Sequence, residues 1–277
     1  MVHEPLNERF GMEDVPISYP YANDNKSIFA PLLDDAIKFA RHWNKDVSYI
    51  KAKGVRRKIF SITGGKSGMR WGWLRLRKKI GNPHVNICLK DPFMTLATPF
   101  LLHQYHLNII CMVRHPAAIH YSSLKQGWRF DVNNLLKQPD LLALYGHDIP
   151  SVHWDLARKH PAASIALLWK IMIRINSGLT ENKQLLMISH EALCIEPIDI
   201  GRRICMHAGI SFSHNLNNFL LNHCYGERAE SKVGYVHDFR RNSKSLVTLW
   251  RSHINLKDEL MMREMIGDKV EEFYGKW

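Results

Sequence analysis

Short apolar runs rich in β-branched residues alternate with longer amphipathic stretches through the middle of this chain. Such alternation is typical of βα units, in which buried parallel strands are joined by crossover helices. The predicted strands are residues 58–63, 84–90, 107–114 and 184–189, and the predicted helices are residues 69–80, 92–104, 117–127, 161–178, 197–208 and 256–277. We therefore expect an α/β protein with a central parallel sheet in a three-layer α/β/α arrangement. Residues 13–31 and 222–245 lack periodicity and are predicted loops.

Composition indicates a globular protein with anionic partners but does not identify its function. The 277 residues are 45% hydrophobic, enough for a substantial core, and the formal net charge is +12, which favours anionic partners. A nucleotide, nucleic acid, an anionic membrane or a sulfated polymer would all satisfy that charge. The five scattered cysteines indicate a reducing cytoplasm, and no apolar run is long enough for a membrane span.

The residues that close the predicted strands define the expected binding edge. Ligands of an open parallel sheet bind beyond the carboxyl ends of its strands. Three of these four ends carry a Lys or Arg, so the predicted edge is basic; the four ends are Gly64-Gly65-Lys66, Lys90-Asp91, Arg114-His115 and His190-Glu191.

The stretch GGKSG at residues 64–68 follows a predicted strand and precedes a predicted helix. Backbone N–H groups of such a turn can surround an oxyanion. The nucleotide-triphosphatase pattern GxxxxGK[ST] would need a glycine at position 60, where the chain has Phe60. Lys66 and Ser67 are therefore candidates for an anion site that is not a Walker A loop.

Arg114 and Ser122 form a second candidate anion site. Arg114 closes the predicted strand 107–114, and Ser122 follows eight residues later in the predicted helix 117–127. A guanidinium and a hydroxyl so placed can bind one phosphate from two sides. The alternative is a structural arginine that caps carbonyl groups.

At these residues the chain resembles the sulfotransferases that use 3′-phosphoadenosine 5′-phosphosulfate, in particular bacterial members. VRHPAAIHYSSLKQGWRF resembles their 3′-phosphate site at Arg114 and Ser122. Further similarity lies in HEPLN (residues 3–7), LKDP (89–92), SHEAL (189–193) and RRNSKSLVTLWRSHINLKDEL (240–260), the last with Arg241, Ser243, Trp250 and Arg251 in a cofactor-facing segment.

The resemblance implies a P-loop nucleotide-hydrolase-like fold in one domain, residues 1–277, that transfers a sulfuryl group to a carbohydrate or lipid-linked hydroxyl without a metal. Arg114, Ser122 and Arg241 would hold the donor nucleotide. The family's phosphosulfate loop is expected upstream of the segment that starts at residue 3, so the chain is predicted to lack its first strand, loop and helix. Lys66 and Ser67 reproduce part of that loop's spacing at another place in the order.

Lys90, Asp91 and Glu4 are the candidate catalytic residues. Sulfuryl transfer needs a base for the acceptor hydroxyl and a cation near the developing charge. Better-known family members have a basic histidine where this chain has Pro92, which leaves Asp91 as the available carboxylate, Lys90 as the cation, and Glu4 or His3 as further candidates for the base. Alternatively, Asp91 caps a helix that begins at Pro92.

Three other functions remain open at this stage. The chain can be a catalytically inactive relative that binds nucleotide, a P-loop kinase that uses residues 64–67 with Mg²⁺, or a nucleic-acid-binding module supported by charge alone. We favour sulfuryl transfer over these three, with no nucleic acid partner, no membrane span and no metal. His103 and His106 have the spacing of one helix face, but no third ligand is near in sequence.

Overall fold

The structure, a computed structural model, describes residues 88–226 and 242–277, residues 2–3, and eight positions between residues 30 and 80. The chain forms two compact units, Met1–Thr95 and Leu96–Trp277. In the first unit, β1 (Val2–His3) pairs in parallel with β2 (Leu89–Lys90), and His3 lies opposite Lys90. The predicted strand 58–63 and most of the predicted helix 69–80 lie outside the described residues.

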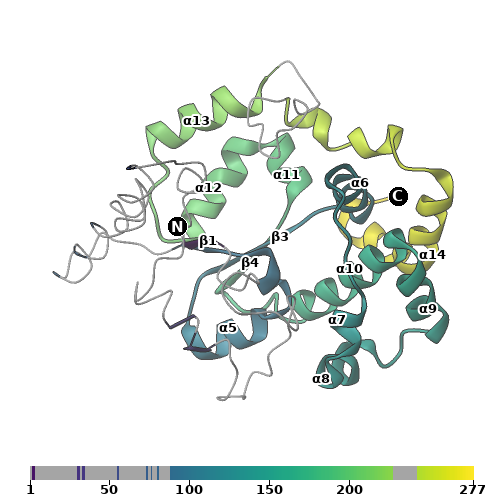
Figure 1. The fold of residues 1–277 in the computed structure, drawn as a ribbon. Coiled ribbons are helices and arrows are strands. Elements are labelled where there is room, and N and C mark those ends of the chain that lie inside the picture. Colours follow the sequence, from purple (N-terminus) through teal and green to yellow (C-terminus); the bar gives the residue numbers. More distant parts are fainter. Residues whose placement is uncertain are drawn as a thin grey trace. The chain divides into compact units, whose positions relative to one another are not determined.

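The second unit contains the parallel strand pair that positions the candidate site. β3 (Ile109–Val113) and β4 (Leu185–Ser189) are in register over all five residues of each strand. Both strands were predicted, and their parallel pairing confirms a mixed α/β protein. The described part of the chain is otherwise mostly helical, and its sheets are two parallel pairs, β1 with β2 and β3 with β4 (Figure 1).

Most of the helices predicted for the second unit are confirmed, and several short ones between residues 128 and 160 were not predicted. The described helices are α5 (Thr98–Tyr105), α6 (Pro116–Gln126), α7 (Asn133–Leu136), α8 (Pro139–Leu141), the π-helical turn η3 (Leu142–Gly146), α9 (Ser151–Lys159), α10 (Pro161–Ser177), α11 (His190–Ile195), α12 (Pro197–His207), α13 (His214–Cys224), the 3₁₀ turns η4 (Lys244–Leu246) and η5 (Leu249–Ser252), and α14 (Leu256–Tyr274).

Two sequence predictions are corrected. The helix predicted over residues 92–104 is divided into a 3₁₀ turn, η2 (Pro92–Leu96), and α5. Pro99 fits this division, because it lacks an N–H and is tolerated in the first turn of a helix but not in a helix interior, so α5 starts anew just before it. The loop predicted over residues 222–245 begins later than expected, since α13 continues to Cys224.

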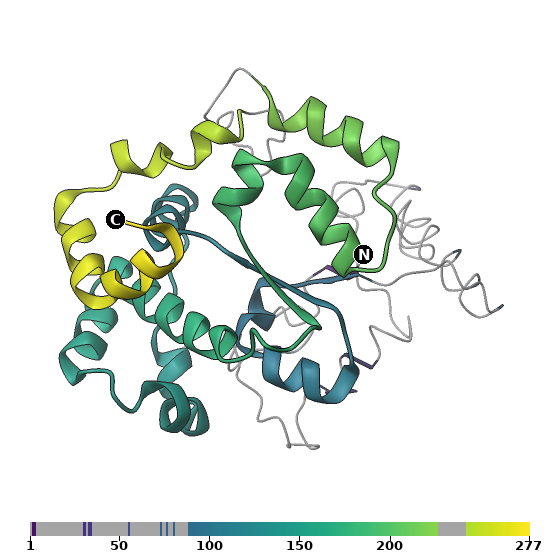
Figure 2. The same ribbon diagram turned by 180° about the vertical axis from the view of Figure 1, so that it is seen from behind.

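The core of the second unit is built around α10. This helix begins with Pro161 and ends at Gly178, and twelve of its residues are buried, so nearly its whole circumference is packed. It lies alongside α9, α14 and α6 (Figures 1 and 2). Lys170 of α10 donates a hydrogen bond to the Met265 carbonyl of α14 at 3.1 Å. The carboxyl-terminal helix is thereby fixed to the core.

Candidate functional site

The turn from β3 into α6 carries the predicted anion-binding arginine. Arg114 directly follows the buried Val113, and its own side chain is half-buried. His115 is the N-cap of α6, with Nδ1 accepting a hydrogen bond from the Ala117 amide at 3.3 Å. Pro116 occupies the first helical position, where its missing N–H has no cost. Arg114 therefore lies at the carboxyl edge of the strand pair, where parallel sheets bind ligands.

The peptide group that joins Arg114 to His115 is held from both sides. Its carbonyl accepts a hydrogen bond from the indole Nε1 of Trp169 at 2.9 Å, and its N–H donates to Oε1 of Glu191 at 3.0 Å. Trp169 is 1% exposed and Glu191 is 7% exposed, so water does not compete strongly for either bond. The backbone direction at Arg114 is consequently set by α10 on one side and α11 on the other.

Ser122 lies on α6, two helical turns after Arg114, as predicted. Its side chain is half-buried, as is that of its neighbour Ser123. Neither Arg114 nor Ser122 is sealed within the core. The structure thus places both residues of the predicted phosphate site in one unit, on a strand end and the helix that follows it.

The sequence analysis gave Glu191 no role of its own: it was noted as a residue closing a predicted strand and as part of the SHEAL stretch. It follows β4, whose last residue Ser189 caps α11 by accepting a hydrogen bond from the Ala192 amide at 3.0 Å. Because β3 and β4 are neighbours and parallel, the residues after their ends meet, which is why Glu191 reaches the amide of His115. Position at a strand end was the sequence signal that could have identified it.

An aromatic cluster from the carboxyl-terminal segment encloses the His115 ring. Trp250 stacks on it at 4.4 Å with an interplanar angle of 15°, and Trp277 and Tyr274 lie at 4.9 and 5.3 Å. Burial, followed by the nearby positive charge of Arg251, lowers the pKa of His115 from 6.5 to about 3. The imidazole is therefore neutral at physiological pH, which suits its role as hydrogen-bond acceptor at the start of α6.

Tyr274 brings a second buried polar group to Glu191. Its hydroxyl and Oε2 of Glu191 are both buried, and neither has a hydrogen bond of ordinary geometry within the described part of the chain. Burial, and then the negative charge of Glu191, raise the pKa of Tyr274, whereas the charge of Arg114 lowers it. Arg114, Glu191 and Tyr274 thus form one electrostatic neighbourhood. Tyr274 was not identified from the sequence, because it lies far from both strands along the chain.

The segment that resembles a cofactor-facing region lies against the same neighbourhood. Trp250 contacts His115, as described above, and Ser243 is buried with its hydroxyl donating to the Cys194 carbonyl of α11 at 2.6 Å. Ser243 therefore fastens the segment to α11. Arg251 is exposed and lies 4.9 Å from the Trp250 ring.

The candidate catalytic residues Lys90 and Asp91 belong to the first unit. Lys90 is exposed in β2, and Asp91 follows it with a half-buried side chain. His3 pairs in parallel with Lys90, so residues 2–3 lie beside β2. Asp91 precedes η2, and its carbonyl accepts a hydrogen bond from the Met94 amide at 3.3 Å, so the predicted helical start at Pro92 is confirmed as a 3₁₀ turn.

Four of the predicted site residues, Glu4, Lys66, Ser67 and Arg241, lie outside the described residues. The anion-binding role of the GGKSG stretch, and its similarity to the phosphosulfate loop, therefore stay predictions. Among the described residues, no group of three or more His, Cys, Asp or Glu could hold a metal ion. No helix in that same part is long and apolar enough to cross a membrane.

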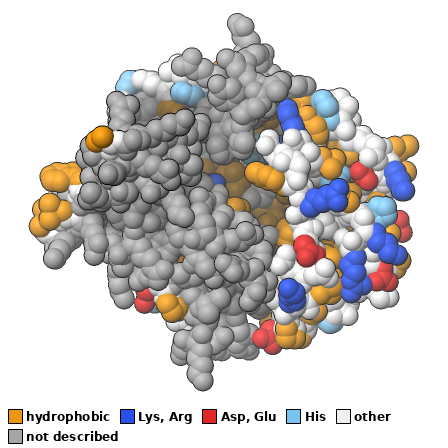
Figure 3. All heavy atoms as spheres, in the orientation of Figure 1, with side chains coloured by type: hydrophobic (Ala, Val, Ile, Leu, Met, Phe, Trp, Pro, Cys, Tyr) orange, Lys and Arg blue, Asp and Glu red, His pale blue; other side chains and the backbone are white. Residues whose placement is uncertain are grey.

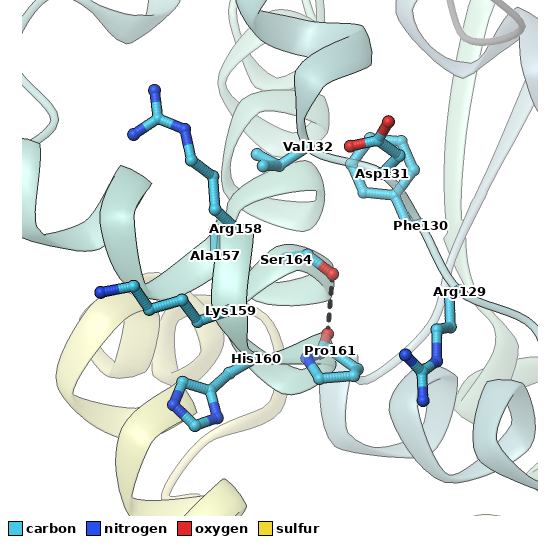
Figure 4. A pocket seen from close by; sticks show the side chains of 10 residues that line it. All are labelled: Arg129, Phe130, Asp131, Val132, Ala157, Arg158, Lys159, His160, Pro161 and Ser164. Carbon is cyan, nitrogen blue, oxygen red and sulfur yellow. Dashed lines mark hydrogen bonds between the residues drawn. The ribbon is translucent and has the colours of Figure 1, made fainter.

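A small pocket that sequence analysis did not identify lies between the end of α9, the start of α10 and the segment after α6 (Figure 4). Its volume is about 220 Å³, and Arg129, Arg158, Lys159 and His160 contribute to its lining. The Ser164 hydroxyl at its base donates to the carbonyl of the neighbouring Pro161. Figure 4 shows the Arg158 and Lys159 side chains extending away from this base.

Positive charge is not confined to that pocket. On the face shown in Figure 3, Lys and Arg side chains of the Leu96–Trp277 unit are spread among acidic and hydrophobic ones. The described Lys and Arg side chains on that face therefore do not form the continuous basic stripe that would favour nucleic acid. Comparison of the chain with protein-family models, with curated proteins and with solved structures finds no match.

Proposed function

We propose that this protein is a sulfotransferase that transfers a sulfuryl group from 3′-phosphoadenosine 5′-phosphosulfate to a hydroxyl of a carbohydrate or lipid-linked acceptor, without a metal. The proposal is supported by the β3–α6 turn, in which a half-buried arginine follows a parallel strand and Ser122 follows two helical turns later. Arg114 and Ser122 would bind the 3′-phosphate of the donor.

The physical reason for this assignment is the fixed backbone of Arg114. A guanidinium binds a phosphate best with two parallel N–H···O bonds, which requires a defined direction. The hydrogen bonds from Trp169 and to Glu191 define the direction of the Arg114 main chain before any ligand arrives.

In the proposed reaction, the acceptor oxygen attacks the sulfur in line with the bond to the 5′-phosphate oxygen. The S–O bond to the nucleotide breaks, a sulfate ester forms, and 3′,5′-adenosine bisphosphate leaves. Asp91 would take the acceptor proton, with Glu4 as the other candidate base, and Lys90 would balance charge on the transferred group. Arg241, Lys66 and Ser67 would complete the nucleotide contacts.

We further propose a three-layer α/β/α fold of the P-loop nucleotide-hydrolase type, and that the protein acts in the cytoplasm. The first of these proposals is supported by the parallel register of β3 with β4 and by the helix that follows β3.

Calorimetric titration with 3′,5′-adenosine bisphosphate tests the proposed donor site. We expect micromolar binding to the unmodified protein. A charge-assisted hydrogen bond contributes about 1.5–3 kcal/mol, so Arg114→Ala should weaken binding by about 10- to 150-fold. Ser122→Ala removes a neutral bond and should weaken it by about 2- to 10-fold.

Two matched variants serve as controls. Ser123→Ala makes the same change at the next position of α6, and Arg158→Ala removes an exposed arginine that pairs with Asp155 elsewhere in the unit. Both should bind as the unmodified protein does. Binding that Arg114→Ala leaves unchanged would refute the assignment, as would equal losses in Arg114→Ala and Arg158→Ala.

A further inference from the structure

The buried carboxylate of Glu191 contacts the backbone of the proposed donor site, at the peptide group that follows Arg114. Its Oε1 accepts the N–H of His115 at 3.0 Å, and that N–H belongs to the same peptide group whose carbonyl is bound by Trp169. Rotation of this one peptide group would change both the direction of Arg114 and the start of α6. Glu191 and Trp169 together prevent that rotation.

The second oxygen of Glu191 is a further acceptor in this cluster. Oε2 is buried without a partner among the described residues, and so is the hydroxyl of Tyr274. An unpaired buried carboxylate oxygen costs stability, and a phenol is a suitable donor for it. Tyr274 also contacts the His115 ring, with ring centroids 5.3 Å apart, so the hydroxyl and the carboxylate belong to one cluster.

We propose that Glu191 is a positioning residue for the anion site at Arg114, and that Tyr274 steadies Glu191 by donating its hydroxyl proton to Oε2. The proposal rests on the proposed donor site in one respect, namely that Arg114 binds the 3′-phosphate. Glu191 does not touch the nucleotide. It acts by holding the Arg114–His115 peptide group so that the guanidinium approaches the phosphate in one orientation.

The test compares three substitutions at Glu191. Glu191→Gln keeps a side-chain oxygen for the His115 N–H, and its new amide can donate to the Tyr274 hydroxyl, so it should bind 3′,5′-adenosine bisphosphate within about threefold of the unmodified protein. Glu191→Ala removes the acceptor and should weaken binding by about tenfold or more. If Glu191→Ala does not fold, Glu191→Asp decides the question, since it keeps the charge but is one methylene too short to reach His115.

A second measurement separates this proposal from the function it rests on. Hydrogen exchange of the His115 amide reports the bond to Glu191 whether or not a nucleotide binds. It should be slow in the unmodified protein and in Glu191→Gln, and faster in Glu191→Ala and Glu191→Asp. If exchange at His115 follows this pattern but no variant binds the nucleotide, the donor site is refuted. The positioning of the peptide group by Glu191 then still holds.

The control is Glu196→Ala, which removes an exposed carboxylate a few residues further along the chain. It should change neither readout. Tyr274→Phe should make exchange at His115 faster than in the unmodified protein and weaken binding less than Glu191→Ala does. The positioning role is overturned if Glu191→Ala accelerates exchange at His115 but leaves nucleotide affinity unchanged, or if Glu191→Gln loses as much affinity as Glu191→Ala.

Discussion

Proton uptake by His115 in the unfolded chain should lower the stability of the protein in mildly acidic solution. The ring is 5% exposed, and its pKa is lowered from 6.5 to about 3 by burial and by Arg251. In the unfolded chain the same ring takes up a proton near pH 6.5. Between pH 6.5 and pH 3 the unfolded state therefore binds one more proton than the folded state, so stability is full above pH 6.5 and falls as the pH is lowered.

The size of the effect follows from the pKa difference. Each pH unit in this window costs about 1.4 kcal/mol, so lowering the pH from 6.5 to 5 should remove about 2 kcal/mol and the full window about 5 kcal/mol. The chain has 16 histidines, and others also titrate here. The comparison must therefore be made against a variant that lacks this ring alone.

His115→Asn is the suitable variant, because asparagine is a good N-cap and does not titrate. Urea unfolding of both proteins should be measured at pH 7.5, 6.5, 5.5 and 5. The unmodified protein should be the more stable of the two at pH 7.5, where the aromatic contacts count in full, and its advantage should shrink by about 2 kcal/mol at pH 5. An advantage that stays constant with pH would show that His115 accepts a proton freely in the folded state and would refute this reasoning.

Three further predictions concern the surroundings of the site. Trp169→Phe leaves the Arg114 carbonyl without its indole donor and should lower the free energy of unfolding by at least about 1–3 kcal/mol, as measured by urea denaturation. Asn255→Ala removes the N-cap of α14, whose side chain accepts a backbone N–H at 2.8 Å, and should cost about 1 kcal/mol in the same assay. Burial raises the pKa of Cys111 to about 11, so in the folded protein at pH 8 it should react with a thiol reagent far more slowly than the exposed Cys88, and equal rates would contradict its burial.

The parts of the fold that could be predicted are those with strong local signals. α10 was recognised because Pro161 begins it and Gly178 ends it, and α14 because Asn255 caps its first turn. β3 and β4 were recognised from apolar β-branched runs. The short helices of residues 133–159 were missed, since elements of three to nine residues give too few turns for a clear periodicity.

The candidate site shows the same division between local and long-range information. Arg114 and Ser122 lie close together in the sequence, so their strand-end and helix positions could be inferred. The support for Arg114 could not be inferred, because only the tertiary fold brings Trp169 and Glu191 to its peptide group and Tyr274 to the adjoining His115 ring. Hydrophobic pattern and helix caps carry no information about which distant side chain satisfies a given backbone N–H.

The central claim is that Arg114 recognises the 3′-phosphate of the donor nucleotide, and a comparison of two ligands on two proteins tests it most directly. Binding of 3′,5′-adenosine bisphosphate and of adenosine 5′-monophosphate, which lacks only the 3′-phosphate, should be measured for the unmodified protein and for Arg114→Ala. The unmodified protein should prefer the bisphosphate by about tenfold or more, and Arg114→Ala should lose most of this preference. An equal preference in both proteins would mean that the 3′-phosphate is bound elsewhere and that Arg114 does not recognise it.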